Sequence, residues 1–292
     1  MSDMASTPAG ERIDAHQHFW RYDPAEHAWM TEEMAAIRRD FVPEDLKPLL
    51  DQLGFGGSVA VQARQNVEET RWLLELAGRY EFIRGVVGWV DLRSPELPRQ
   101  LERFAGERKL VGVRHVVQDE PDDEFMLRSD FRAGIARLAE FGLAYDVLIY
   151  PRQLPAAIRL VGEFPGQRFV LDHIAKPAIG EGRREPWESG LRELAKSPNL
   201  FCKLSGMVTE ARWKQWGHAD FRPYLDAVYE AFGPERLMIG SDWPVCTLSA
   251  SYSSAMEIVL DYIAQFPAEV QDGILGTNCA RFYGLGERGI RD

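Results

Sequence analysis

The 292-residue sequence predicts an α/β protein of the (β/α)8 class, a TIM barrel in which helices surround eight parallel strands. Two observations carry this prediction: eight apolar, strand-like runs alternate with helical patterns, and no strand is followed by the G-x-G-x-x-G turn of a doubly wound dinucleotide-binding sheet. The length suits one such barrel and no linker or low-complexity segment interrupts it. We therefore expect a single domain over residues 1–292, with a disordered tail over residues 1–11.

The strand-like runs recur at regular intervals, as a barrel requires. Each is a short apolar stretch bounded by polar or turn-forming residues. They begin near Arg12, Gly57, Ile83, Leu110, Ala144, Arg168, Leu200 and Arg236.

Helical patterns lie between these runs. Residues 66–80 place Val67, Leu74 and Ala77 on one apolar stripe at helical spacing. Residues 129–142 open on a Ser-Asp cap and close on a glycine, which are helix start and stop signals. The remaining predicted helices cover residues 155–164, 186–195, 221–232 and 254–266.

Composition excludes several classes of partner and location. The formal net charge of −11 disfavours nucleic acid or an anionic membrane surface as a partner. No stretch approaches the roughly 20 apolar residues that span a bilayer, and residues 1–12 lack the apolar core of a signal peptide. The three scattered cysteines fit a reducing compartment. We expect a cytoplasmic protein that binds a small molecule, and no feature specifies its oligomeric state.

His16-Gln17-His18, at the end of the first strand-like run, is the most informative motif. Successive side chains of a strand alternate faces, so the two imidazoles are expected side by side as half of a metal or proton-transfer site. Two later runs, residues 169–173 and 237–242, also end in ionisable side chains, His173 and Asp242. Because barrel active sites lie at the carboxyl ends of the strands, these groups are expected to share one site.

Four segments carry the polar groups of these strand ends in a characteristic order. They are Ile13-Asp14-Ala15-His16-Gln17-His18-Phe19-Trp20, Leu171-Asp172-His173, Cys202-Lys203-Leu204-Ser205-Gly206 and Gly240-Ser241-Asp242-Trp243-Pro244. Together they resemble the amidohydrolase superfamily, and more closely its sugar-lactonase branch, the L-fuconolactonase and L-rhamnonolactonase type. The resemblance runs from about Arg12 to Tyr283. It implies a (β/α)8 barrel that hydrolyses a lactone ring, with L-fucono- or L-rhamnono-lactone as substrates.

The chain departs from the superfamily's binuclear members at two places. Those members carry a carboxylated lysine after strand four and a histidine after strand five, whereas this chain has Arg114-His115 and no histidine in residues 145–152. A two-metal site is therefore not expected. The ligands that remain suit one divalent ion such as zinc, and the resemblance implies that activity does not require it. These ligands are His16, His18, His173 and Asp242.

Lactone hydrolysis needs an activated water and a group that stabilises the developing oxyanion. Asp242 is the expected base, and water positioning must compensate for the low basicity of a carboxylate. Arg114, whose charge is permanent, is the first candidate to polarise the carbonyl, with a histidine of the first strand as the alternative. The structural alternative is that Arg114 is an ion-pair partner of Asp119 or Asp146.

Further side chains are candidates for substrate contacts. Two of them have structural alternatives: His115 faces away from Arg114 in a regular strand, and Lys203 is also suited to pair with a barrel carboxylate. These donors suit a neutral, polyhydroxylated ring, and an aromatic side chain suits stacking on that ring. The candidates are Gln62, Trp29, His115, Lys176 and Lys203.

Two other functions use the same residues. A metal-dependent decarboxylase of the same superfamily would need a tightly bound ion. A non-catalytic barrel that acts as a binding protein would tolerate replacement of His16, His18 and Asp242. The motif set favours the lactonase.

Overall fold

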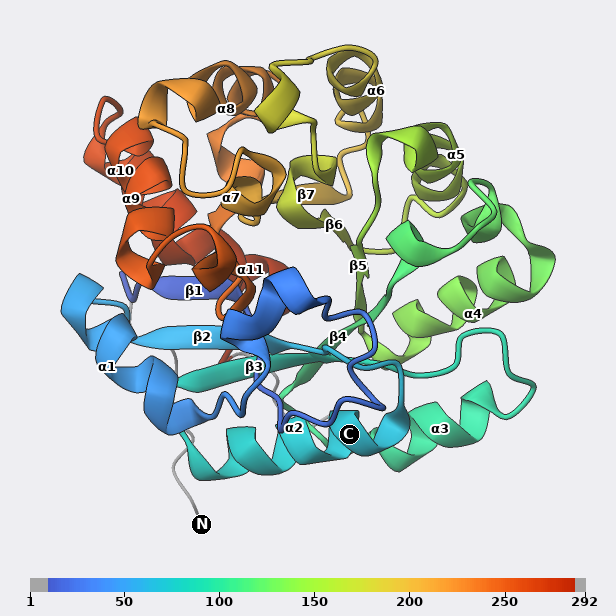
Figure 1. Cartoon of the computed structure of the whole chain (residues 1–292). Coiled ribbons are helices and arrows are strands. Elements are labelled where there is room, and N and C mark those ends of the chain that lie inside the picture. The colour runs from blue at the N-terminus through green and yellow to red at the C-terminus, as the bar shows by residue number, and fades with distance from the viewer. Residues whose placement is uncertain (1–9, 287–292) are drawn as a thin grey trace.

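The computed structural model describes residues 10–286, and its centre is an eight-stranded parallel sheet in the order β1 to β8. Figure 1 shows the strands in the middle of the molecule with helices around them, which confirms the predicted (β/α)8 barrel. Five predicted strand starts coincide with the observed ones, and three lie one residue early. The strands are β1 (Ile13–Gln17), β2 (Gly57–Val61), β3 (Ile83–Gly88), β4 (Leu110–His115), β5 (Ala144–Val147), β6 (Phe169–Leu171), β7 (Leu200–Leu204) and β8 (Leu237–Ile239).

All six predicted helices are present, with ends shifted by up to four residues. They are α2 (Val67–Arg79), α4 (Ser129–Leu138), α5 (Leu154–Glu163), α6 (Trp187–Leu194), α8 (His218–Phe232) and α9 (Tyr252–Ile263).

Five helices were not predicted from the sequence, and all but α1 have seven residues or fewer. The longest of them, α1, has Pro48 in its interior and a proline at its first position, so its pattern reads as a break. The missed helices are α1 (Pro43–Leu53), α3 (Leu97–Arg103), α7 (Met207–Glu210), α10 (Ala268–Asp272) and α11 (Asn278–Tyr283).

The apolar core has two parts. The larger one lies between the strands and the surrounding helices, where the buried stripe of each helix packs. The smaller one fills the lower interior of the barrel, and α11 closes it from below with Cys279, Phe282 and Tyr283. Among residues 10–286, no helix is both long and apolar enough to cross a membrane.

The first and last strands meet without a ladder of strand hydrogen bonds among the described residues. Instead, the residues just beyond the strands close the barrel. The backbone N–H of Asp242 donates to the carbonyl of His16 (2.8 Å), and the N–H of His18 donates to the carbonyl of Trp243 (2.6 Å). The seam of the barrel is therefore formed by the segments that carry the predicted site residues.

The predicted N-terminal tail is partly ordered. Residues 1–9 lie outside the described part of the chain, but Glu11 forms an ion pair with Arg84 (2.6 Å). Its backbone also packs against Gly276, in the π-helical segment Gly273–Thr277 that precedes α11. This contact fixes the lower end of the seam.

Replacing Gly276 with alanine is expected to loosen this closure. A Cβ at Gly276 would overlap the backbone carbonyl oxygen of Glu11, whereas a Cβ at Gly273 comes no closer than 3.4 Å to the Asn278 side chain, which is ordinary contact. Overpacking against backbone costs about 1–3 kcal/mol, so Gly276→Ala should lower the thermal unfolding midpoint by several degrees. Gly273→Ala is the matched control. Equal midpoints for both variants would contradict this account of the seam.

Candidate active site

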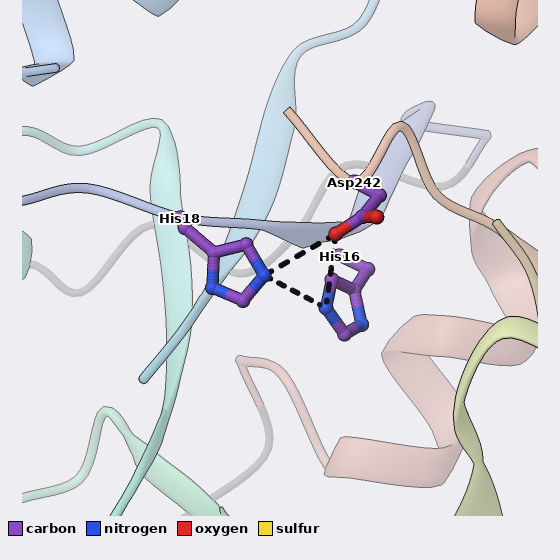
Figure 2. A group of neighbouring side chains, drawn as sticks. All are labelled: His16, His18 and Asp242. Atoms are coloured by element: carbon purple, nitrogen blue, oxygen red, sulfur yellow. Dashed lines mark hydrogen bonds and ion pairs between the residues drawn. The ribbon is translucent and has the colours of Figure 1, made fainter. Parts of the chain in front are cut away.

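Three side chains from the two ends of the sheet meet at the mouth of the barrel. Figure 2 shows the imidazoles of His16 and His18 turned toward the carboxylate of Asp242. Oδ1 of Asp242 lies 3.3 Å from Nε2 of His18 and 3.8 Å from Nε2 of His16, and the two imidazole nitrogens are 3.2 Å apart. All three residues are buried. A polar cluster this compact is costly to bury unless it has a purpose.

The atoms that face one another in this cluster are acceptors. Nδ1 of His18 lies 2.8 Å from the carbonyl of Val61, which assigns the proton to Nδ1 and leaves Nε2 with a free lone pair. Nδ1 of His16 faces Asp172 Oδ1 at 3.3 Å, which leaves its Nε2 in the same state. Two ligands of a tetrahedral zinc ion with bonds of about 2.1 Å lie roughly 3.4 Å apart. The cluster therefore fits one metal ion by donor type and by spacing.

Burial sets the charges of these groups. It lowers the pKa of His16 well below its usual value and that of His173 to about 4, so both imidazoles are neutral at neutral pH. Burial acts in the opposite sense on Asp242, but the neighbouring imidazoles, that of His173 first, outweigh it and lower the pKa of the carboxyl. Neutral imidazoles beside a carboxylate are the states that both metal binding and proton acceptance require.

His173 reaches the cluster through an unusual turn. Strand β6 ends at Leu171, and residues 173–176 all have positive φ (49° to 59°), which is a left-handed turn of non-glycine residues. This conformation costs roughly 1–2 kcal/mol per residue, and such strain concentrates at functional sites. The turn leaves Nε2 of His173 at 3.8 Å from Asp242 Oδ1, while its Nδ1 bonds the Ser205 hydroxyl at 2.9 Å.

Gly206 is required beneath this turn. It has a φ of +63°, and a Cβ at this position would overlap the His173 imidazole. The Ser205-Gly206 pair of the lactonase-like motif therefore supports His173 from below.

Arg114 lies at the floor of the same site. Its Nη1 donates to Asp172 Oδ2 (3.0 Å) and lies 3.3 Å from Nε2 of His16, and its Nη2 bonds the side chain (2.9 Å) and the carbonyl (2.6 Å) of Gln62. The alternative ion pairs with Asp119 or Asp146 are not found among the described residues, because Asp172 takes that place. A fixed guanidinium thus stands beside the cluster.

A buried charged layer supports the cluster from inside the barrel. Nζ of Lys203 donates to Asp146 Oδ2 (2.5 Å) and lies 3.1 Å from Asp172 Oδ1 and 3.2 Å from His16 Nδ1. The Tyr283 hydroxyl bonds Asp146 from below (2.8 Å). In a dry interior these opposite charges stabilise one another, and they hold the ring of His16 in place.

The site opens into a cavity of about 450 Å³. Asp242 and the imidazoles lie at its floor, and the long segment that follows β1 forms part of its wall. Its lining residues are His18, Trp20, Glu26, Trp29, Ala63, Arg64, Gln65, Asn66, Arg114, Val116, Gln118, Asp119, Leu148, His173, Lys176, Asp242 and Val245.

Most of the site residues predicted from sequence meet here. His18, His173, Asp242, Arg114, Lys176 and Trp29 line the cavity, and His16 lies directly against it.

Three predicted substrate contacts lie elsewhere. Gln62 is fully buried and holds Arg114, Lys203 is fully buried in the charged layer, and His115 stacks on Phe125 (ring centroids 5.0 Å apart). None of the three lines the cavity, so we no longer expect them to touch a substrate. For Lys203 and His115, the structural alternatives describe the observed contacts.

Two kinds of site residue were not predicted from the sequence. Asp172 bonds Arg114 and faces His16, and its signal was the side-chain alternation that continues from the interior residue Val170. Glu26 lines the cavity from a turn and Gln118 from the short 3-10 helix Val117–Asp119, and no periodicity marks either residue.

The barrel and its floor define a class of protein: hydrolase-like barrels whose site is built from histidines and a carboxylate at the strand ends. The family profile described as amidohydrolase matches residues 13–285. This chain belongs to the amidohydrolase family.

Two curated relatives and one solved structure are similar over most of the chain. An L-fucono-1,5-lactonase of Burkholderia multivorans is 44% identical over 287 residues, which cover 94% of this chain and 97% of the relative. An L-fucono-1,5-lactonase of Burkholderia ambifaria is 42% identical over 244 residues, which cover 82% of this chain and 83% of the relative. A crystal structure of an amidohydrolase from Burkholderia multivorans with bound zinc matches with a TM-score of 0.91 and 43% identity. The match covers 94% of this chain and 99% of the chain in that structure.

The charged layer predicts a strong effect of Lys203→Met on stability. The substitution leaves the buried carboxylates of Asp146 and Asp172 without their shared cation, which should cost about 3–5 kcal/mol in free energy of unfolding. Asp146→Asn added to it should restore part of the loss. Lys196→Met, at an exposed pair with Glu193, is the control and should cost under about 0.5 kcal/mol. Similar urea midpoints for the two lysine variants would contradict the role of this layer.

Proposed function

We propose that this chain hydrolyses a sugar-acid lactone, with L-fucono-1,5-lactone as the first candidate, to the free aldonic acid. One observation carries the proposal: the floor of the cavity combines an ionised carboxylate, neutral imidazoles and a fixed guanidinium, the set that hydrolysis of an activated ester needs. The two fuconolactonases, which match 94% and 82% of this chain, support the same reaction.

In the proposed mechanism Asp242 activates water. Its carboxylate accepts a proton as the water oxygen attacks the lactone carbonyl carbon, which forms a tetrahedral oxyanion. When this collapses, the bond to the ring oxygen breaks, and the proton returns from Asp242 to the alkoxide. An open-chain hydroxy acid results, and the enzyme ends in its starting state.

Arg114 is placed to stabilise the oxyanion. Asp172 and Gln62 hold its guanidinium, so its charge is fixed before the reaction begins. Lys176, on the same cavity wall as His173, is a second cation within the lining. With His115 and Lys203 outside the cavity, we assign Arg114 to the carbonyl and Lys176 to a ring hydroxyl.

One divalent ion such as zinc would be held by His16, His18 and Asp242, with His173 as a further ligand. When bound, it would supply positive charge that polarises an oxygen. We propose that this charge is not essential, because Nη1 of Arg114 already lies 3.3 Å from Nε2 of His16. The relevant positive charge at the floor is thus provided by the chain itself.

The upper cavity suits a neutral, hydroxylated ring. Trp29 is 39% exposed and packs edge-on against Trp20 (6.1 Å), which leaves a ring face for the apolar side of a sugar. Oε1 of Gln118 is buried in the cavity wall without a partner among the described residues, and it suits a hydroxyl donor. Free, buried cysteines, namely Cys202, Cys246 and Cys279, support the proposal that the protein works in the reducing cytoplasm.

Asp242→Asn is expected to remove lactone hydrolysis without unfolding the chain. The amide keeps the shape of the side chain but accepts no proton, so kcat for L-fucono-1,5-lactone should fall by about 10²–10⁴. Turnover is followed with a pH indicator, and circular dichroism checks the fold. Asp261→Asn, at an exposed pair with His218, is the control. Unchanged kcat in the folded Asp242→Asn protein would exclude Asp242 as the base.

Removal of metal is expected to leave appreciable activity. After dialysis against a chelator, we expect metal analysis to show that re-added zinc binds at no more than one ion per chain, because the two groups of possible ligands share His16. Activity before and after re-addition should agree within a small factor. Loss of activity that zinc restores in proportion would show instead that the metal is essential, as the decarboxylase alternative requires.

A further inference from the structure

An ion pair spans the outer part of the cavity. Glu26, in the long segment after β1, pairs with Nη1 of Arg64, which lies three residues beyond the end of β2. Both residues line the cavity that ends at Asp242. Their side chains are 49% and 21% exposed, whereas that of Asp242 is 6% exposed. The pair therefore lies toward the opening, and the reacting groups lie at the floor.

Arg64 is anchored from behind. Its Nε lies 3.3 Å from Oε1 of the buried Glu69, and its backbone N–H donates to Oε2 of the same carboxylate at 2.7 Å. The backbone N–H of Ala63 donates to that oxygen too (2.9 Å). Glu69 thus fixes one edge of the guanidinium and the loop that carries it, and the other edge is left for the cavity.

The pair has unused hydrogen-bonding capacity. Within residues 10–286, Nη2 of Arg64 and Oε1 of Glu26 have no hydrogen-bond partner. A charged donor beside a charged acceptor complements two adjacent hydroxyls, because one hydroxyl accepts from the guanidinium while its neighbour donates to the carboxylate. A neutral apolar ring would gain nothing from this arrangement.

We propose that the Glu26–Arg64 pair determines substrate specificity by binding the vicinal diol that lies farthest from the ester. This inference rests on the proposed function. In a six-membered 1,5-lactone the ester bond joins C1 to the ring oxygen, and C3 and C4 are the ring atoms opposite that bond. With the ester at Asp242, the C3 and C4 hydroxyls point toward the opening, where the pair lies. The pair is thus a recognition element, separate from the groups that activate water.

The test is a cycle between a protein group and a substrate hydroxyl. kcat/KM is measured for L-fucono-1,5-lactone, its 4-deoxy analogue and unsubstituted δ-valerolactone, with the wild type, Glu26→Gln and Arg64→Lys. Hydrogen bonds to charged groups contribute about 1.5–3 kcal/mol, so Glu26→Gln should lower kcat/KM for the fuconolactone roughly 10- to 100-fold. Glu26 is half-exposed, so its variant is expected to fold, and thermal unfolding checks this.

The cycle gives a distinctive pattern if the pair binds the diol. For the wild type, kcat/KM should be roughly 10- to 100-fold lower for the 4-deoxy analogue than for the fuconolactone. For Glu26→Gln this difference in kcat/KM should be much smaller, because the variant already lacks the bond to the Glu26 carboxylate. Arg64→Lys, which keeps the charge but not the planar fork, should show the same loss of discrimination. Glu163→Gln, at an exposed pair with Arg132, is the matched control and should behave as the wild type.

Two results would overturn the inference. An equal decrease in kcat/KM of Glu26→Gln for all three lactones would mean that the pair only holds the loop that carries Arg64. Full discrimination in both variants would mean that other groups read the diol. In either case an active wild type leaves the proposed function intact. A folded wild type that hydrolyses none of the lactones overturns the proposed function and the inference with it.

Discussion

Closure of the barrel between β1 and β8 is the constraint on which the rest of the structure depends. The seam is held at its upper end by the Asp14 carboxylate, which accepts the backbone N–H (2.9 Å) and the hydroxyl (2.6 Å) of Ser241. The same carboxylate accepts the backbone N–H of His16 (3.1 Å). These bonds fix the two segments that carry His16 and Asp242. The geometry of the site is therefore set by the bonds that close the fold, and neither can change alone.

The charged layer inside the barrel makes a second demand on the sequence. Asp146, Asp172 and Lys203 each follow an interior residue of their strand by two positions, so all three point into the barrel above its apolar filling. Burial of one such charge would be very costly, but the lysine compensates the two carboxylates and Arg114 adds a second cation. This balance lets the imidazole above remain neutral in a dry environment, where its lone pair is available.

The sequence was sufficient to predict the strands, because short apolar runs between turn residues are a local signal. It also placed the key side chains at the strand ends. It was less reliable where the chain leaves regular structure. Side-chain alternation was extended to His173 and Asp242, yet β6 and β8 end earlier, and both residues adopt positive φ in the turns that follow. Lys203 and Gln62 were expected in the cavity, because their partners across the barrel cannot be read from local sequence.

The site divides into a floor and an opening of different origin. The floor is formed by strand ends and by turns tied to the seam, so a substitution that breaks the bonds of the seam also disturbs the barrel. The opening is formed by longer loops, whose half-exposed groups such as Glu26 contribute little to the core. The chemistry of the floor suits any activated ester, whereas recognition of a particular ring must come from side chains nearer the opening. In this architecture a change of substrate needs only loop substitutions, and the same floor can act on a different ring without loss of stability.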